Sequence, residues 1–392
     1  MTYYMLPHTT KNMLKHIHCI TDEGPPQPAT SHTLSKFIAS MKERITPVET
    51  KWDEYKKYTN PYEFIHTPIP SRHRSVARYK PLSRSYFKMI ELIRLFELLD
   101  VSGPIRTFHL AEGPGGFIEA VARVRDNSND QYIGMTIQDE DNSVPGWKRT
   151  YQVLKRYPNI QIENGATGTG DILDPDNFAY INDTYRHTMH LVTGDGGFDF
   201  SENFNHQEHD IIRLLYGQVC YALVMQKHGG HFVLKMFDCF YQHTVDILYI
   251  LSAFYQKVYI CKPHTSRYAN SEKYIICRGY IQHDDVNVYA LLRQSFNEAV
   301  REDRHIHRLV RVPISAFFNT KVQEYNAVLG QQQLENIMLT LNLITQDLCD
   351  SEKRNNHAAR CNGNVLRCVQ WCNKYNIEIN ASVITESMTV TH

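Results

Sequence analysis

The stretch His109–Phe117, HLAEGPGGF, constrains the fold of this chain more than any other part of its sequence. A short apolar run, Thr107–Leu110, leads into Gly113-Pro114-Gly115-Gly116, and a helix-like run, Phe117–Arg125, follows. A buried strand, a glycine turn and a helix in this order are typical of the first unit of a doubly wound α/β domain. Glycines let a ligand approach bare backbone, so we expect a ligand at the carboxyl end of the strand, against the start of the helix.

The glycine turn by itself leaves the ligand open. A dinucleotide-binding turn would have G-x-G-x-x-G, but the third glycine position counted from Gly113 is Ile118, and no phosphate-cradling P-loop is present in this stretch. A strand-to-helix turn without any ligand is the simpler alternative.

Composition narrows the class of protein. The 392 residues are enough for two domains, or for one domain with sizeable extensions. The formal net charge is zero, so nucleic-acid binding would require a local basic patch. No apolar run approaches the roughly 20 residues of a membrane span, and the N-terminus lacks the apolar core of a secretory signal. We therefore expect an intracellular protein, cytoplasmic or nuclear, that makes no membrane contact.

The cysteines and histidines predict no metal site. Nine cysteines without a framework suit a reducing compartment, and none of the candidate ligand groups has paired C-x-x-C spacing. Buried free thiols and surface histidines are the better explanation. The groups considered are His16, His18 and Cys19; His187 with His190; and Cys361, Cys368 and Cys372.

Strand-like and helical runs alternate after the glycine turn, which predicts a parallel sheet with right-handed crossovers. No helix fits between the last two strand-like runs, Lys257–Cys261 and Lys273–Arg278, so the final strand should be antiparallel. The other strands are expected at Gln131–Thr136, His190–Thr193 and His231–Met236, and helices at Glu208–Lys227 and Thr244–Tyr255.

Two regions flank this core. Residues 1–75 are proline-rich and are expected to be irregular, apart from a helix at Ser31–Arg44, and to contact RNA; residues 76–285 form the core domain. Residues 286–392 are expected to be a helical appendage with a frayed end, Asn380–His392. Its predicted helices are Val288–Val300, Val322–Leu348 and Val365–Tyr375.

A basic run, Arg72–Arg94, precedes the glycine turn, and Ser83–Leu99 should be a helix with Ser83 near its cap. The position of the run predicts an RNA-facing patch, although a solvated face is the usual explanation of such charges. Farther upstream, Lys51–Phe64 mixes aromatic and basic side chains, which suits stacking on bases, or equally a surface helix packed by its aromatics.

Four charged residues stand out once the strands and the helix before them are placed. Asp195 ends a strand and precedes two glycines, and Lys235 closes an otherwise apolar strand. Glu272 opens the last strand, and Lys88 lies on the helix before the sheet. A structural ion-pair network is the alternative to a catalytic cluster.

The four residues follow the order Lys-Asp-Lys-Glu along the chain. With this order and the glycine turn, the chain resembles the RrmJ/FtsJ-type S-adenosylmethionine-dependent RNA 2′-O-methyltransferases. The family motifs match S-R-x-x-F-K at Ser83–Lys88, the glycine turn at Glu112–Phe117 and a strand-end aspartate at Asp195. They also match the F-V-L-K strand that ends at Lys235 and K-P-x-x-S-R-x-x-x-S-E at Lys262–Glu272. The five motifs occur in family order over roughly residues 80–280. The resemblance implies a Rossmann-like α/β methyltransferase with a mostly parallel seven-stranded sheet.

The chain is most similar to the eukaryotic and viral cap-specific mRNA 2′-O-methyltransferases, especially their second-nucleotide branch. Runs such as HLVTGDGGFD at His190–Asp199 and NSEKYIIC at Asn270–Cys277 carry this similarity. Thr136 stands where bacterial relatives have an acidic residue. Asp171 matches the position of the carboxylate that holds the adenine amino group in relatives, and the alternative role for Asp171 is that of a helix cap. The resemblance implies S-adenosylmethionine as methyl donor and capped mRNA as substrate, with the capping or transcription machinery as further partners.

The resemblance also implies roles for individual residues. The implied catalytic residues are Lys88, Asp195, Lys235 and Glu272. The implied cofactor-binding residues are Glu112, Gly113, Pro114, Gly115, Gly116, Phe117, Thr136, Asp171 and Asp195. The expected RNA-binding residues are Arg72, Arg74, Arg78, Lys80, Arg84 and Arg267.

The chemistry suits these residue types. A ribose 2′-hydroxyl must lose its proton as it attacks an already activated methyl group, so positioning and hydroxyl activation carry most of the catalysis. A lysine can serve as the base only if its pKa falls from about 10.4 towards neutrality, which a neighbouring cation or burial would cause. Methylation of rRNA or tRNA, and a non-catalytic RNA-binding subunit with this fold, are the alternative functions.

Overall fold

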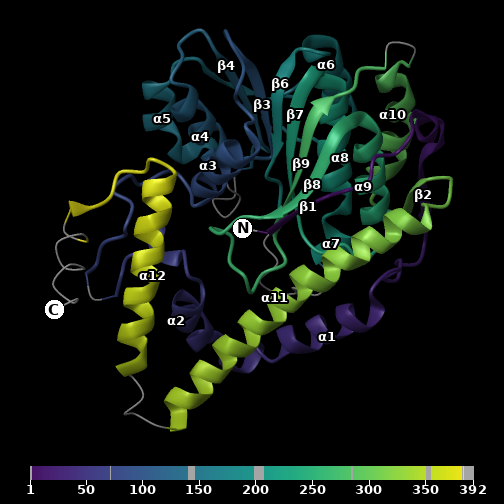
Figure 1. The fold of residues 1–392 in the computed structure, drawn as a ribbon. Coiled ribbons are helices and arrows are strands. Elements are labelled where there is room, and N and C mark those ends of the chain that lie inside the picture. Colours follow the sequence, from purple (N-terminus) through teal and green to yellow (C-terminus); the bar gives the residue numbers. More distant parts are fainter. Residues whose placement is uncertain are drawn as a thin grey trace.

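The core of the protein is an eight-stranded sheet with the strand order β1-β8-β9-β7-β6-β3-β4-β5 (Figure 1). The computed structural model describes residues 2–70, 72–139, 146–197, 207–283, 286–349, 355–381 and 383. The strands of the sheet are β1 (Thr2–Met5), β3 (Arg106–Leu110), β4 (Gln131–Met135), β5 (Ile160–Glu163), β6 (Met189–Gly194), β7 (Gln226–Met236), β8 (Tyr255–Lys262) and β9 (Lys273–Tyr280).

The predicted parallel sheet is confirmed. Strands β5, β4, β3, β6 and β7 are parallel neighbours, and β9 lies antiparallel between β7 and β8. The chain order reverses between β3 and β6, so the crevice of a doubly wound sheet opens at the carboxyl ends of these two strands.

The sheet has one strand more than the seven that the family resemblance implied. Residues Thr2–Met5, expected to be irregular, pair antiparallel with β8 at the edge of the sheet. The ring of Tyr3 packs edge-on against Phe96, and the ring of Tyr4 stacks on Tyr325 at a centroid distance of 4.7 Å. A strand of four residues is too short to give a clear alternation in the sequence, so only these distant contacts define it.

Helices cover both faces of the sheet (Figure 1). One face packs against α6, α8 and α9, with α10 packed on α8, and the other face packs against α3, α4 and α5. Side chains two positions apart on a strand point to the same face of a sheet. Phe108 and Leu110 on β3 therefore both belong to the core cluster on the first face. The helices are α3 (Ser85–Phe96), α4 (Gly116–Arg125), α5 (Tyr151–Arg156), α6 (Pro175–Tyr185), α7 (Gln207–Asp210), α8 (Ile212–Met225), α9 (Gln242–Phe254) and α10 (Val288–Ala299).

The predicted C-terminal appendage is not purely helical. Strand β10 (His305–Val310) pairs antiparallel with β2 (Ile17–Asp22) in a separate two-stranded ribbon that packs against α9 and α10. Asp246 on α9 anchors this ribbon, accepting hydrogen bonds from Arg308 Nε and the Leu309 amide, both at 2.8 Å. The ribbon therefore joins the two flanking regions, which a local pattern could not indicate.

The N-terminal and C-terminal helices pack together below the sheet (Figure 1). The long helix α11 (Ala316–Cys349) runs beside α1 (His32–Glu43) and α2 (Glu49–Thr59), and α12 (Asn355–Lys374) contacts α2 and η3 (Glu63–Ile65). A small apolar cluster joins them; it comprises Ile38, Met41, Phe240, Leu334, Ile337 and Leu341. The remaining short helices are η1 (Lys11–His16), η2 (Thr46–Val48) and η4 (Trp147–Arg149).

The chain after α12 is held in place at its first residues, where a frayed end was expected. Ile379 forms a β-bridge with Ala77, and Asn380 Nδ2 donates to the Ser75 carbonyl at 2.7 Å. Val383 is fully buried. The expectation of fraying is therefore wrong for Asn380 and Val383, and residues 382 and 384–392 lie outside the described residues.

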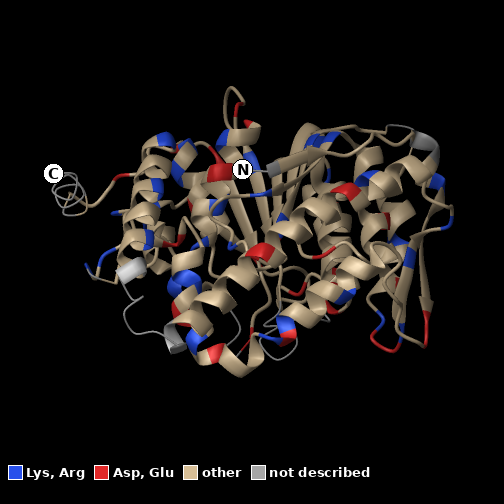
Figure 2. Cartoon of the chain, turned by 60° about the horizontal axis from the view of Figure 1, so that its bottom comes forward, with Lys and Arg blue, Asp and Glu red and all other residues tan. Residues whose placement is uncertain are grey.

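The distribution of charge and the hydropathy of the helices can be compared with the composition. Acidic and basic side chains are both spread over the molecule (Figure 2), and the sequence contains 42 of each. None of the described helices is both long and apolar enough to cross a membrane.

Candidate active site

The glycine turn lies at the carboxyl end of β3, where the sequence predicted it. Gly115 has φ of 104°, which favours glycine, and α4 begins at the next residue. A Cβ on Gly116 would lie 2.1 Å from Ser85 Oγ and 2.3 Å from Ser83 Oγ. The turn is therefore packed directly against the start of α3, the helix that carries Lys88.

Glu112 holds the glycine turn in place through hydrogen bonds to the start of α4. Its carboxylate accepts hydrogen bonds from the amides of Phe117 and Ile118, the latter at 2.9 Å, and lies 3.2 Å from His109 Nδ1. Burial raises the pKa of Glu112, and the neighbouring His109 opposes that rise. The structure thus places this predicted cofactor residue among protein partners at the helix start, where it fixes the turn.

A second loop closes on the carboxyl end of β4. A Cβ on Gly170 would lie 2.0 Å from the carbonyl oxygen of Thr136, and the Gln138 amide donates to the Thr169 carbonyl at 2.7 Å. Asp171 Oδ1 accepts from the Leu173 amide at 2.8 Å. The helix cap of α6 is Asp174, so the capping alternative for Asp171 is wrong.

Trp147 is a site residue that the sequence analysis missed. Its ring fills the space over two glycines: a Cβ on Gly134 would lie 2.5 Å from the ring, and one on Gly115 would lie 3.1 Å from it. The indole Nε1 is buried and has no hydrogen-bond partner among the described residues. Glycine at position 134, inside a strand, was the one available signal, because it marks a close approach.

The four charged residues singled out in the sequence come together as two ion pairs. Lys88 Nζ lies 2.7 Å from Glu272 Oε1 and 2.8 Å from Oε2. Lys235 Nζ donates to the Asp195 carbonyl oxygen at 2.6 Å and lies 3.2 Å from Asp195 Oδ1. We call these four residues the tetrad.

The electrostatics show that the two pairs form one cluster. Burial lowers the pKa of Lys88, while the charges of Glu272 and Asp195 act to raise it. For Glu272 burial alone would raise the pKa, but the charges of Lys88, Arg84 and Lys235 together lower it. The cluster therefore stabilises an ionised Glu272 beside Lys88.

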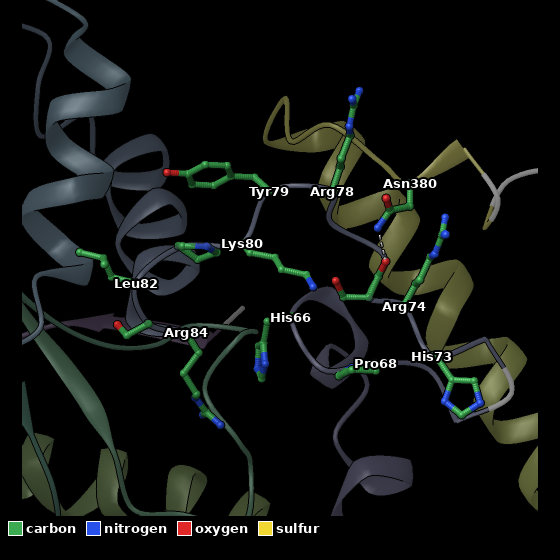
Figure 3. A pocket seen from close by; sticks show the side chains of 13 residues that line it. His66, Pro68, His73, Arg74, Arg78, Tyr79, Lys80, Leu82, Arg84 and Asn380 are labelled. Carbon is green, nitrogen blue, oxygen red and sulfur yellow. Dashed lines mark hydrogen bonds between the residues drawn. The ribbon is translucent and has the colours of Figure 1, made fainter. Parts of the chain in front are cut away.

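Some of the predicted RNA-binding residues are exposed without an ion pair among the described residues, and others are bonded to the protein itself. Arg74 and Lys80 are exposed and line a pocket of about 530 Å³ between residues 66 and 84, which Asn380 also borders (Figure 3). Arg72 donates to the Val383 carbonyl at 3.1 Å, and Arg78 pairs with Glu378. These two arginines therefore hold the C-terminal segment as well as bordering the basic region.

The other two predicted RNA-binding arginines point inward. Arg84 extends away from Arg74 and Arg78 in Figure 3, and its charge acts on Glu272 in the tetrad. Arg267 forms an ion pair with Glu63 at 2.6 Å. The Glu63 partner was not foreseen, because it lies 204 positions away in the sequence.

The doubly wound sheet, the glycine turn and the crevice at the switch point define a Rossmann-like methyltransferase fold. A family model described as FtsJ-like methyltransferase matches residues 81–280, about half of the chain. The chain belongs to this family, and the family uses S-adenosylmethionine as methyl donor.

Individual relatives extend the comparison. The chain is 35% identical over 185 residues to a mouse protein named cap-specific mRNA (nucleoside-2′-O-)-methyltransferase 1, covering 45% of this chain and 22% of that protein. It is 30% identical over 216 residues to the Trypanosoma brucei brucei protein of the same name, covering 53% and 57%. The chain thus spans about a fifth to just over half of these relatives. A solved ribosomal RNA methyltransferase from Plasmodium falciparum gives a TM-score of 0.37 at 18% identity, covering 51% of this chain and 99% of that one.

The residues present fit S-adenosylmethionine. The Trp147 ring occupies the space over Gly115 and Gly134, and its buried Nε1, which has no partner among the described residues, offers a hydrogen-bond donor to a ligand beside it. Two carboxylates, Asp171 and Asp195, lie after β5 and β6 on the same edge of the sheet. Carboxylates at this edge suit S-adenosylmethionine, because this ligand carries a positive sulfonium and a positive ammonium group.

Proposed function

We propose that this protein transfers a methyl group from S-adenosylmethionine to a ribose 2′-hydroxyl of RNA, at a cap-proximal nucleotide of mRNA. The observation that carries the proposal is the tetrad: two ammonium–carboxylate pairs beside the glycine turn, at the carboxyl ends of the strands. Membership of the FtsJ-like family supports the reaction type. The names of the mouse and trypanosome relatives support the cap-proximal target.

Each tetrad residue has a role in this proposal. S-adenosylmethionine, when bound, supplies an activated methyl group to the ribose oxygen. Lys88, fixed by Glu272, positions that oxygen, and Lys235, fixed by Asp195, first gives up its own proton to water and then, as the neutral amine, receives the hydroxyl proton. Because both ammonium groups are tied to carboxylates, they are held in place before the substrate arrives.

The exposed basic residues support RNA as the substrate. Arg74 and Lys80 line a pocket next to Arg84, whose charge reaches the tetrad. We propose that RNA downstream of the modified nucleotide follows this pocket, with the core at residues 76–285 flanked by the extensions 1–75 and 286–392. Capping or transcription machinery as a further partner belongs to the same proposal.

Methyl transfer onto short RNAs that carry cap 0, cap 1 or no cap tests the proposal, with the modified nucleotide mapped in the product. Substituting Lys235→Ala should lower kcat by at least about 100-fold and leave RNA affinity unchanged. Lys257→Ala, an exposed lysine on β8, is the matched control and should keep full activity. Transfer only to uncapped structured RNA would favour rRNA or tRNA methylation, and full activity of Lys235→Ala would reject the tetrad mechanism.

A further inference from the structure

Lys262 is a buried lysine that the proposed mechanism does not use. It is the last residue of β8, and β9 begins at Lys273, so residues 263–272 form the connection between the two strands. We call this segment the β8–β9 loop. Lys262 is only 4% exposed, and its side chain packs into the loop that ends at Glu272 of the tetrad.

The side-chain nitrogen of Lys262 donates to neutral oxygens of the β8–β9 loop. Nζ lies 2.7 Å from the Glu272 carbonyl oxygen and 2.8 Å from the Asn270 carbonyl oxygen. It also lies 2.9 Å from Asn270 Oδ1 and 3.3 Å from Ser266 Oγ. An ammonium has three donor hydrogens, and the three shortest contacts use all of them. Lys262 therefore binds the backbone on both sides of Ser271, directly at the tetrad carboxylate.

The Lys262 side chain takes over where the pairing of β8 with β9 ends. Cys261 is the last residue of β8 that pairs with β9, and it lies opposite Tyr274. The Glu272 carbonyl lies beyond this last pair, and Lys262 Nζ donates to it in place of a strand amide. A buried carbonyl without a donor is unfavourable, so this hydrogen bond completes the end of the ladder.

A buried ammonium is a costly way to close a loop. Burial lowers the pKa of Lys262 to about 7, although the charge of Glu272 acts to raise it. An apolar side chain of similar size would fill the same space without the cost of removing a charge from water. The hydrogen bonds, rather than the volume of the side chain, therefore account for a lysine at this position.

Helix α3 contacts both ends of the same loop. Glu91 on α3 accepts a hydrogen bond from the His264 amide at 2.8 Å, near the start of the loop. Lys88, one turn earlier on α3, pairs with Glu272 at the end of the loop. Glu91 thus fixes the first residues of the loop, and Lys262 fixes the last ones, next to the carboxylate that meets Lys88.

We propose that Lys262 is a positioning residue for methyl transfer: it holds the backbone at Glu272 so that this carboxylate meets Lys88. The proposal rests on the proposed function, because it takes the Lys88–Glu272 pair to position the ribose oxygen. Lys262 acts through Glu272 and touches neither RNA nor S-adenosylmethionine. Misplacement of a positioning group by about 1 Å can lower a rate about 100-fold, so a residue behind the tetrad can control its rate.

Urea denaturation tests the coupling between Lys262 and Glu272 without an activity assay. Glu272→Gln is introduced into the wild type and into Lys262→Met, which removes the donors and keeps a long side chain. The shift of the urea midpoint caused by Glu272→Gln should be at least halved in the Lys262→Met background, because the carboxylate is no longer held on Lys88. Lys257→Met, at an exposed position of β8, is the matched control background and should leave that shift unchanged.

Single-turnover methyl transfer and steady-state kinetics test the consequence for catalysis. Lys262→Met should lower the rate about 10- to 100-fold, while KM for RNA and Kd for S-adenosylmethionine stay within about twofold of the wild type. A lysine with a merely structural role would change both affinities together with the rate. Lys257→Met should keep the wild-type rate.

The outcomes separate this inference from the proposed function. An equal midpoint shift in the wild type and in Lys262→Met overturns the inference, and so does a wild-type rate in Lys262→Met. Should Lys262→Met fail to fold, Lys262→Gln takes its place with the same expected results, since it keeps a polar group in the buried site on a shorter side chain. If the urea coupling is present but the wild type transfers no methyl group, Lys262 positions Glu272 and the proposed activity is wrong.

Discussion

Lys88 and Glu272 are 184 positions apart, yet the ammonium of one lies 2.7 Å and 2.8 Å from the two carboxylate oxygens of the other. Lys88 lies on α3, which precedes β3 in the chain, and Glu272 directly precedes β9. Both side chains are almost completely buried. The pair therefore ties α3 to the start of β9, and it forms half of the tetrad.

Removing one member of this pair should destabilise the protein. Glu272→Gln leaves the Lys88 ammonium buried without its closest counter-charge, which we expect to cost about 3 kcal/mol of unfolding free energy. The double variant Lys88→Met/Glu272→Gln should recover part of that loss, because no unpaired charge remains. Urea denaturation measures both. Equal stability of wild type and Glu272→Gln would show that water reaches the pair.

The ion pair between Glu63 and Arg267 should make stability depend on acid pH. Burial alone would raise the pKa of Glu63, but its hydrogen bonds and charge contact with Arg267 lower it to about 2. A lowered folded-state pKa stabilises the fold fully above pH 4.5 and loses this contribution as the pH falls towards 2. The contribution at neutral pH is about 3 kcal/mol.

Unfolding free energies between pH 6 and pH 3 test this linkage. The slope with pH should be smaller in Glu63→Gln than in the wild type, whereas Glu302→Gln, at an exposed position, should leave the slope unchanged. Identical slopes for Glu63→Gln and the wild type would mean that Glu63 has the same pKa in the folded and unfolded chain.

The exposed basic residues predict the salt dependence of RNA binding. Arg74→Ala/Lys80→Ala should weaken RNA binding several-fold and reduce the slope of log K against log salt by about 1 to 1.5, since two phosphate contacts are lost. Arg293→Ala, an exposed arginine on α10, should change neither quantity. Salt titrations of a fluorescent RNA measure the slopes, and an unchanged slope in the double variant would exclude this pocket from the RNA path.

We expect substitutions at two nearby carboxylates, Asp171 and Asp174, to change different properties. Asp171→Ala should weaken binding of S-adenosylmethionine about tenfold, through loss of a charge-assisted hydrogen bond. Asp174→Ala should leave that affinity unchanged and cost about 1 kcal/mol of stability, because Asp174 caps α6. Calorimetry and thermal unfolding separate the two effects. Unaltered donor affinity in Asp171→Ala would restrict this residue to its bond with the Leu173 amide.

Features that depend on neighbours in the sequence could be predicted before the structure was known. The glycine turn, the alternating strands and the missing crossover before Lys273 were enough for the parallel sheet with its antiparallel strand β9. Strand ends were sufficient to single out Asp195 and Lys235, because parallel strands end on the same edge. Lys88 and Glu272 were singled out by their places on the helix before the sheet and at the start of the last strand, and the family motifs then implied their catalytic roles.

Features that depend on distant partners could not be predicted in this way. Arg84 belongs to the same basic run as Arg74, and Arg267 belongs to the motif at Lys262–Glu272. The structure turns Arg84 towards the tetrad and Arg267 towards Glu63. Trp147 follows no motif, and its position over Gly134 exists only once β4 and η4 are packed.

The sequence by itself determined the topology of the core and the order of its charged residues, because hydrophobic periodicity and turn chemistry act over a few residues. Tertiary structure alone decided that Thr2–Met5 completes the sheet, that β2 pairs with β10, and which cations remain exposed. The physical reason is that pairing and burial are set by the summed contacts of segments hundreds of residues apart, which carry no local signature.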